Sequence, residues 1–239
     1  MHSISKRSAF TLFHNRRDRL YGRLIHDIAT RFNEKDSSDS FDLKTLSDGY
    51  QILLNNNPFK TPSGKIFEFP LRKHNLAYSV LLECRSFSPK FFEYYFSPLT
   101  SLSIRAIDIF SEKKNREQAS DRLLKYLDTD TILSFASKDE SGGDLLVLQK
   151  KMWGPLHEWA QKYWDVQILK TNNDFGIIMN PQPEKTRNLI KEWVCNLDQW
   201  QFAALERAIC LNKSFIIGAK MIATANSSPI ERLGIIHMM

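Results

Sequence analysis

The hydrophobic periodicity of the chain changes near residue 112, and this change constrains the fold most strongly. Before it, short β-prone runs such as YQILL (50–54) and KIFEFP (65–70) are separated by the turn-forming sequences NNNP and TPSG. After it, apolar residues recur at intervals of three and four over long stretches. Closely spaced short strands predict an antiparallel meander, and the longer period predicts helices. We therefore expect an α+β fold, with a small N-terminal antiparallel strand and helix domain (31–111) followed by an all-helical C-terminal domain (112–239).

Within the N-terminal domain, the local signals place individual elements. The polar residues 33–48 are expected to form a loop or a ragged first strand, and residues 71–83 a helix. In the TPSG turn, Pro62 presets the backbone and Gly64 tolerates a positive φ angle at the end of the turn.

The most regular helical pattern in the C-terminal domain lies at residues 144–164. Its apolar stripe consists of Leu145, Leu148, Met152, Leu156, Trp159 and Tyr163. A stripe with this spacing usually faces the core, so we expect these side chains to be buried. Pro155 lacks a backbone N–H and is expected to kink the helix or to split it near Gly154.

A second long helix is predicted over residues 199–223. Asp198 is a suitable N-cap for it, and Gln201, three residues later, completes a capping-box pattern.

The first 30 residues differ from the rest of the chain in charge. Residues 1–33 hold seven basic and two acidic residues, so they supply +5 of the formal net charge of +6. No acid precedes Asp18, and Leu20, Leu24, Ile28 and Phe32 recur every four residues. This amphipathic, arginine-rich composition is typical of a mitochondrial transit peptide, which we place at residues 1–30, although an ordinary basic surface helix has the same pattern. The remaining residues are nearly neutral, which argues against nucleic acid as a partner.

Motifs that would carry enzymatic chemistry are absent from the sequence. It contains no G-x-x-x-x-G-K-[ST], G-x-G-x-x-G, H-E-x-x-H or G-x-S-x-G pattern, and no apolar run long enough to insert into a membrane. The three cysteines (84, 195 and 210) form no C-x-x-C pair and are expected to be free thiols. We therefore expect no enzyme, no cofactor, no metal and no small-molecule substrate.

The segment KYLDTDTILSF raises the question of a metal or phosphate site at Asp128 and Asp130. A hard metal ion requires more oxygen ligands than two carboxylates. Aspartate and threonine also favour helix ends, because their side chains bond to nearby backbone groups. We expect a helix that ends at Leu127 and a new start near Thr129, without a metal ion.

Glu206, in the segment QFAALERAICLNK, is the acid whose helical neighbours are least suited to it. The side chains at i−4, i+3 and i+4 are Phe202, Ile209 and Cys210, and none of them carries a positive charge. A carboxylate on an apolar face costs free energy unless it finds a partner. That partner is either a distant basic side chain of the same chain or a group on another protein.

Several long segments together resemble a known family. YLDTDTILSF, LQKKMWGPLHEWAQKYWDV and WQFAALERAICLNKSFIIGAKM, with LLNNNPFKTPSGKIFEFP and SPLTSLSIRAID before them, are similar to segments of the mitochondrial ATP synthase assembly chaperone that handles the alpha subunit of the catalytic sector. The resemblance covers about residues 48–222, in the right order. The chain departs from the family pattern in its polar first strand and at Cys84, where a tryptophan is usual.

This resemblance implies a non-enzymatic chaperone of the mitochondrial matrix that holds the alpha subunit until the beta subunit replaces it. The family's functional acid falls on Glu206, so we expect Glu206, Phe202, Cys210 and Lys213 to bind the partner. The alternative from a different class is a mitochondrial RNA-associated protein, which would use aromatic stacking and local basic patches.

Overall fold

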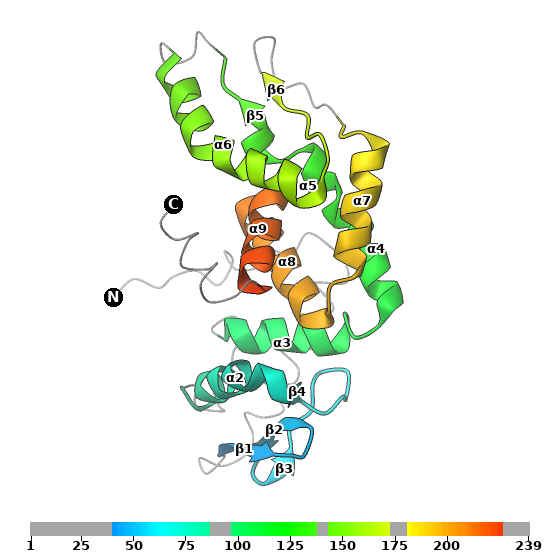
Figure 1. Cartoon of the computed structure of the whole chain (residues 1–239). Helices are drawn as coiled ribbons and strands as arrows, with labels where there is room; N and C mark the ends of the chain where they lie inside the picture. The colour runs from blue at the N-terminus through cyan, green and yellow to red at the C-terminus, as the bar shows by residue number, and fades with distance from the viewer. Residues whose placement is uncertain (1–39, 87–96, 138–142, 173–180, 227–239) are drawn as a thin grey trace, which may run out of the picture. The chain divides into compact units, whose positions relative to one another are not determined.

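The structure is a computed structural model that describes residues 40–86, 97–137, 143–172 and 181–226 (Figure 1). The chain divides into two compact units, Met1–Asp108 and Ile109–Met239, three residues before the boundary expected from the sequence. The predicted leader lies outside the described residues.

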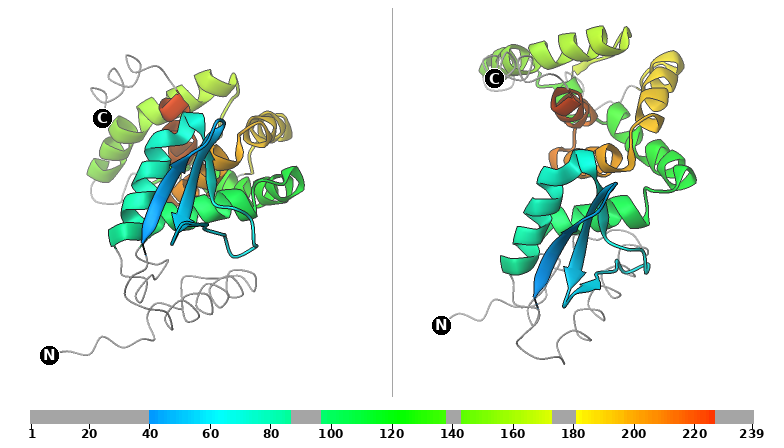
Figure 2. Two further views of the ribbon diagram at one scale, coloured as in Figure 1. Left: turned by 90° about the horizontal axis from the view of Figure 1, so that it is seen from below. Right: turned by 60° about the horizontal axis from the view of Figure 1, so that its bottom comes forward.

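The first unit combines a small antiparallel sheet with two helices. Its strands are β1 (Phe41–Thr45), β2 (Gly49–Leu54), β3 (Asn57–Pro58) and β4 (Glu68–Pro70), followed by the 3-10 helix η2 (Leu71–Lys73) and helices α2 (His74–Ser86) and α3 (Pro98–Asp108). Strand β2 pairs antiparallel with β1, β3 and β4. Helix α2 packs on the sheet, and α3 packs on α2 (Figures 1 and 2). The predicted antiparallel strands and the helix at residues 71–83 are confirmed, and the polar first strand exists as β1.

Turn geometry follows the local sequence signals. Asn55 and Asn56 have φ angles of 51° and 63°, which asparagine tolerates better than most residues. Gly64 has a φ angle of 84°, as predicted for the TPSG turn. At Gly49 the close approach of the paired strand β4 requires glycine, because a Cβ atom there would lie 2.2 Å from the carbonyl oxygen of Phe69.

Carboxylates join the elements of the first unit. Asp108 at the end of α3 accepts hydrogen bonds from the hydroxyls of Thr61 and Ser63, both at 2.5 Å, and thereby holds the TPSG turn. Glu83 of α2 accepts hydrogen bonds from the N–H groups of Leu99 and Thr100, at 3.0 and 2.8 Å. This contact satisfies N–H groups that the first turn of α3 would otherwise leave unpaired.

The second unit is built mainly of helices. They are α4 (Lys113–Leu123), α5 (Lys125–Asp128), the 3-10 helix η5 (Thr131–Leu133), α6 (Asp144–Trp164), α7 (Glu184–Cys195), α8 (Gln199–Asn212) and α9 (Phe215–Asn226). Two short strands, β5 (Ser134–Phe135) and β6 (Thr171–Asn172), pair in parallel, which the all-helical prediction did not include. The α+β class is confirmed.

The prediction of one helix over residues 199–223 is wrong, because the chain forms α8 and α9 there. Lys213 adopts a left-handed conformation, with a φ angle of 57°, and its N–H donates to the carbonyl of Ile209 at 2.8 Å. The hydroxyl of Ser214 then accepts a hydrogen bond from the N–H of Ile217 at 3.1 Å and so begins α9.

The start of α8 agrees with the sequence. The side chain of Asp198 accepts from the N–H of Gln201 at 2.8 Å, and the Gln201 side chain accepts from the N–H of Asp198 at 2.9 Å. The predicted capping box is confirmed.

The prediction of a buried stripe on α6 is wrong. Leu148, Met152 and Tyr163 are exposed by 55%, 55% and 45%. The buried side chains of α6 lie on an adjacent face and are His157, Ala160 and Trp164. Helix α6 also continues through Pro155 and is not split at Gly154. Periodicity showed that α6 has an apolar stripe but did not show which side the neighbouring α9 covers.

Candidate functional site

Asp130 lies at a helix junction and is 2% exposed. One carboxylate oxygen accepts from the N–H of Ile132 at 3.1 Å, and the other accepts from the N–H of Ile216 at 2.9 Å. Asp130 therefore caps both η5 and the distant α9. Burial raises the pKa of its carboxyl above the ordinary range, and hydrogen bonds to the backbone of α9 and to Ser214 oppose this increase.

Asp128 joins α5 to the chain segment before α7. One carboxylate oxygen accepts from the N–H of Gln182 at 3.0 Å, and the other forms an ion pair with Arg187. Helix α5 ends at Asp128 and η5 starts at Thr131. Both boundaries lie within two residues of the predicted helix end at Leu127 and the predicted new start near Thr129. Because both carboxylates accept from protein N–H groups, their role is structural: Asp128 joins α5 to α7, and Asp130 joins η5 to α9.

The described residues contain no group of three or more His, Cys, Asp or Glu side chains that could hold a metal ion. Within the same part of the chain, no helix is both long and apolar enough to cross a bilayer.

Of the four predicted partner-binding residues, Phe202 lies in the N-terminal half of α8, Glu206 and Cys210 lie in its C-terminal half, and Lys213 follows its last residue. Glu206 is half-buried, Cys210 and Lys213 are exposed, and Phe202 is completely buried. The ring of Phe202 packs against Phe110, with 4.6 Å between the ring centroids. Phe202 thus belongs to the core of the second unit, and the surface that it supports consists of the other three residues.

Lys213 also has a structural role. It supplies the left-handed residue that ends α8, and its ammonium group lies 5.8 Å from the ring centroid of Tyr126. Its carbonyl accepts a hydrogen bond from the N–H of Thr131 at 3.4 Å. A substitution at Lys213 therefore changes the fold as well as the surface.

Sequence reasoning missed a surface on α6. We define the α6 apolar face as Leu148, Met152, Trp159 and Tyr163, which lie along one side of the helix. Trp159 and Tyr163 stack with their ring centroids 4.9 Å apart, and Lys220 of α9 lies 4.7 Å from the ring of Trp159. The signal for this face was present as a regular apolar stripe, but a stripe alone does not separate a core face from an exposed one.

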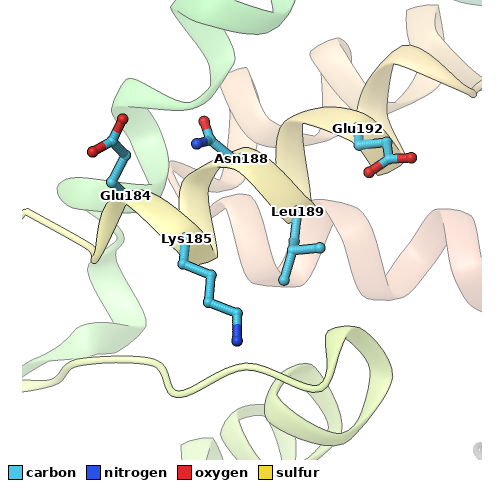
Figure 3. A pocket seen from close by; sticks show the side chains of 5 residues that line it. All are labelled: Glu184, Lys185, Asn188, Leu189 and Glu192. Carbon is cyan, nitrogen blue, oxygen red and sulfur yellow. The ribbon is translucent and has the colours of Figure 1, made fainter.

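The surface of α7 carries a shallow hollow of about 450 Å³ (Figure 3). The side chains that line it are Glu184, Lys185, Asn188, Leu189 and Glu192. All five come from one helix, and they point in different directions from it (Figure 3). Such a hollow lacks the convergent polar groups and the enclosure of a small-molecule site.

Comparison with models of protein families tests the family resemblance that the sequence motifs indicated. The sequence model described as "ATP12 chaperone protein" matches residues 31–161, which is more than half of the chain. The chain belongs to the ATP12 chaperone family. Membership of a chaperone family confirms the resemblance and the expectation that the protein is not an enzyme.

Two fungal members of the ATP12 family illustrate the extent of the similarity. The chain is 39% identical to the mitochondrial protein atp12 of Schizosaccharomyces pombe over 167 residues, 70% of this chain and 57% of that protein. It is 29% identical to the mitochondrial protein ATP12 of Saccharomyces cerevisiae over 204 residues, 74% of this chain and 62% of that protein. The matched regions span less than two thirds of the length of these relatives.

Solved structures share the fold of this ATP12 family member. Atp12 from Paracoccus denitrificans superimposes with a TM-score of 0.65 and 23% identity, covering 81% of this chain and 78% of that chain. The Atu1473 protein of Agrobacterium tumefaciens gives a TM-score of 0.68 and 19% identity, covering 92% and 86%.

Proposed function

We propose that this protein is an assembly chaperone of the mitochondrial ATP synthase that binds the unassembled alpha subunit of the catalytic sector until the beta subunit replaces it. The observation that carries this proposal is the match to the ATP12 chaperone family over residues 31–161. The segment WQFAALERAICLNKSFIIGAKM, which resembles the same family, lies beyond that match and extends the likeness through α8 and α9.

The proposed location is the mitochondrial matrix. Two observations support it: both fungal relatives are named mitochondrial proteins, and the first 30 residues have the composition of a transit peptide. A chaperone for the alpha subunit has to bind it in the compartment where the catalytic sector is assembled. Such a chaperone therefore has to be imported into the matrix.

The proposed contact includes the C-terminal half of α8. Glu206 is half-buried at the edge of a core that contains Phe202 and Ile209, while Cys210 and Lys213 are exposed beyond it. A carboxylate held at the edge of a rigid core meets a partner with little loss of side-chain freedom, which favours specific binding. Charged groups at such an interface set the register and the rate of encounter more than the total affinity.

The test of this function uses isolated alpha subunit diluted from denaturant into a solution with or without the full-length chaperone. We expect the chaperone to suppress the light scattering of the aggregating subunit at a one-to-one ratio and to form a complex that survives gel filtration. Addition of the beta subunit should release the chaperone. Unchanged aggregation with no complex, or nucleic acid retained in place of the alpha subunit, would contradict the proposal.

Glu206→Gln separates a binding role from a structural one, because glutamine keeps the shape of glutamate and removes the charge. If Glu206 contacts the alpha subunit, the variant should keep its melting temperature and bind more weakly, by less than the roughly 2–5 kcal/mol typical of a truncated buried charge pair. Glu192→Gln on the exposed surface of α7 is the matched control. A drop in melting temperature with unchanged affinity of the folded fraction would show that Glu206 has only a structural role.

A further inference from the structure

The α6 apolar face is exposed over much of its length. Leu148, Met152 and Tyr163 are exposed, and Trp159 is half-buried. Tyr163 follows Leu148 by fifteen residues, so the face is about 22 Å long at 1.5 Å per residue. Contiguous exposed apolar surface marks an interaction site more often than single exposed side chains do.

The two ends of this face differ in chemistry. At the N-terminal end, Leu148 and the unbranched side chain of Met152 adapt to the shape of a partner. At the C-terminal end, Trp159 stacks on Tyr163, and the Tyr163 hydroxyl accepts a hydrogen bond from the indole N–H of Trp193 at 3.2 Å. The ammonium group of Lys220 lies over the Trp159 ring. The aromatic end is therefore fixed by contacts within the chain, whereas the aliphatic end is adaptable.

Charges of alternating sign lie along the edge of α6 beside this face, on the side opposite the buried side chains of the helix. The four residues are exposed and follow one another at intervals of seven, seven and four: Asp144, Lys151, Glu158 and Lys162. Within the part of the chain that the structure describes, none of them forms an ion pair. The edge is neutral as a whole, so a partner has to match the order of the signs and not an excess of one charge.

This order of signs is complementary to itself when the helix direction is reversed. If two copies of α6 pack antiparallel about a two-fold axis, the same edge of both helices lies on one side of the pair, running in opposite directions. Lys151 of each copy then lies opposite Glu158 of the other, and Asp144 lies opposite Lys162. The midpoints of these two pairs differ by one and a half residues, or about 2 Å along the helix, so one axis serves both.

The same axis also matches the apolar side chains of the face. The midpoint between Leu148 and Trp159 falls between those of the two charge pairs, so the adaptable Leu148 of one copy meets the fixed Trp159 of the other. Near the axis, Met152 of each copy meets the exposed ring of Pro155 of the other. An antiparallel pair thus places an aliphatic end against an aromatic end at both of its ends.

We propose that the α6 apolar face binds the same face of a second copy of this chain, in an antiparallel, two-fold symmetric pair of α6 helices. A single pair of helices buries less surface than a standard protein interface, so the dimer is weak and forms as the concentration rises. It covers the exposed apolar strip of both copies. The dimer needs no client protein, so its test is separate from that of the proposed function.

Sedimentation equilibrium of the full-length protein measures this dimer directly. We expect the wild type to change from monomer to dimer between about 1 μM and 1 mM, the range of a weak interface. The double variant Leu148→Ser, Met152→Ser should keep its melting temperature, because both side chains are exposed, and should dimerise at least about tenfold more weakly. The matched control is Leu82→Ser on α2, which should dimerise like the wild type, since Leu82 is exposed and outside the face.

Exchange of charges between two variants tests whether the partner is a second copy. Lys151→Glu puts two acids opposite each other and Glu158→Lys puts two lysines opposite each other, twice in each dimer, so each variant alone should dimerise at least about tenfold more weakly. An equimolar mixture of the two variants should regain the association of the wild type at low salt, because acidic side chains at these positions then face basic ones.

Lys150→Glu is the control for the change in net charge. Lys150 is exposed on the same helix but lies about 100° around it from Lys151. This variant should dimerise like the wild type.

Four results would overturn the proposal. A wild type that stays monomeric over the whole range would show that copies of the chain do not use this face. Dimerisation unchanged by Leu148→Ser, Met152→Ser would put the interface elsewhere, and a lower melting temperature of that variant would show that the chain itself covers the face. Failure of the mixture of Lys151→Glu and Glu158→Lys to regain association would show that the two charged edges do not lie side by side.

Discussion

Replacing Gly218 by alanine tests whether α8 and α9 pack as closely as the structure shows. A Cβ atom at Gly218 would lie 2.8 Å from Cγ1 of Ile209 and 3.3 Å from its backbone nitrogen. Ile209 is completely buried, and as a β-branched side chain it has few rotamers to which it can move. The new methyl group therefore forces the two helices apart or strains Ile209.

Two opposing effects determine how much Gly218→Ala changes the free energy of unfolding. Alanine is favoured over glycine inside a helix by about 1 kcal/mol. An extra methyl group in a close-packed contact costs about 1–3 kcal/mol. The steric cost is the larger because the nearest atoms belong to a buried branched side chain and to backbone. We expect Gly218→Ala to lower the free energy of unfolding by about 1 kcal/mol, which corresponds to a decrease of about 2–4 °C in melting temperature for a chain of this size.

Tryptophan fluorescence during urea unfolding is the appropriate measurement. All five tryptophans of the chain lie between residues 153 and 200, so their fluorescence reports on the second unit alone. A double-mutant cycle with Ile209→Ala isolates the contact. Ile209→Ala alone should cost about 2–5 kcal/mol, and the double variant should cost less than the sum of the two single changes by about 1 kcal/mol, since the new methyl group occupies part of the space left by isoleucine.

Either of two results would contradict close packing of α8 against α9 at Gly218. Gly218→Ala could be more stable than the wild type, which would mean that helix propensity outweighs the contact. The two substitutions could also be additive to within about 0.5 kcal/mol, which would mean that residues 209 and 218 do not touch.

Two further predictions concern titratable side chains. His157 is buried, its Nε2–H donates to the carbonyl of Ile132 at 2.8 Å, and burial lowers its pKa below the ordinary 6.5. The stability that neutral His157 contributes is therefore complete above about pH 6.5, and it is lost as the pH falls from there through the folded-state pKa. Urea unfolding at pH 7.5 and at pH 5 should show a lower free energy of unfolding at pH 5. The decrease should be smaller in His157→Gln, because glutamine keeps a hydrogen-bond donor but does not titrate. Among the cysteines, burial raises the pKa of Cys84 to about 12, whereas Cys210 is exposed. A maleimide at pH 7.5 should modify Cys210 in the folded protein and Cys84 only after unfolding, and peptide mass spectrometry showing early modification of Cys84 would contradict its burial.

Several features of the fold were readable from the sequence because they depend on neighbouring residues. The TPSG turn needs only a glycine with positive φ at Gly64, and the start of α8 needs only Asp198 and Gln201 within one helical turn. The change from a strand period to a helix period near residue 112 likewise reflects local sequence, and it predicted the α+β class. The resemblance to a chaperone family came from whole segments in order.

Other features depend on residues far apart in the chain, and these were missed or left open. The sequence predicted a helix junction without a metal ion at Asp130, but it did not predict that the same carboxylate also accepts from the N–H of Ile216, which is 86 residues away. No proline or glycine in the sequence marks the break between α8 and α9 at Lys213. The break depends on the left-handed backbone conformation of Lys213, which hydrogen bonds to Ile209 and Thr131 stabilise.

The clearest division between sequence and tertiary structure lies on α6. The sequence by itself determined that residues 144–164 form a helix with an apolar stripe, since spacings of three and four place those side chains on one side. Only the tertiary structure decided that α9 packs against α6, where Phe215 contacts Trp164, and that Leu148 and Met152 remain at the surface. The physical reason is that periodicity records which residues share a face, whereas burial depends on which neighbour covers it, and that neighbour lies about sixty residues further along the chain.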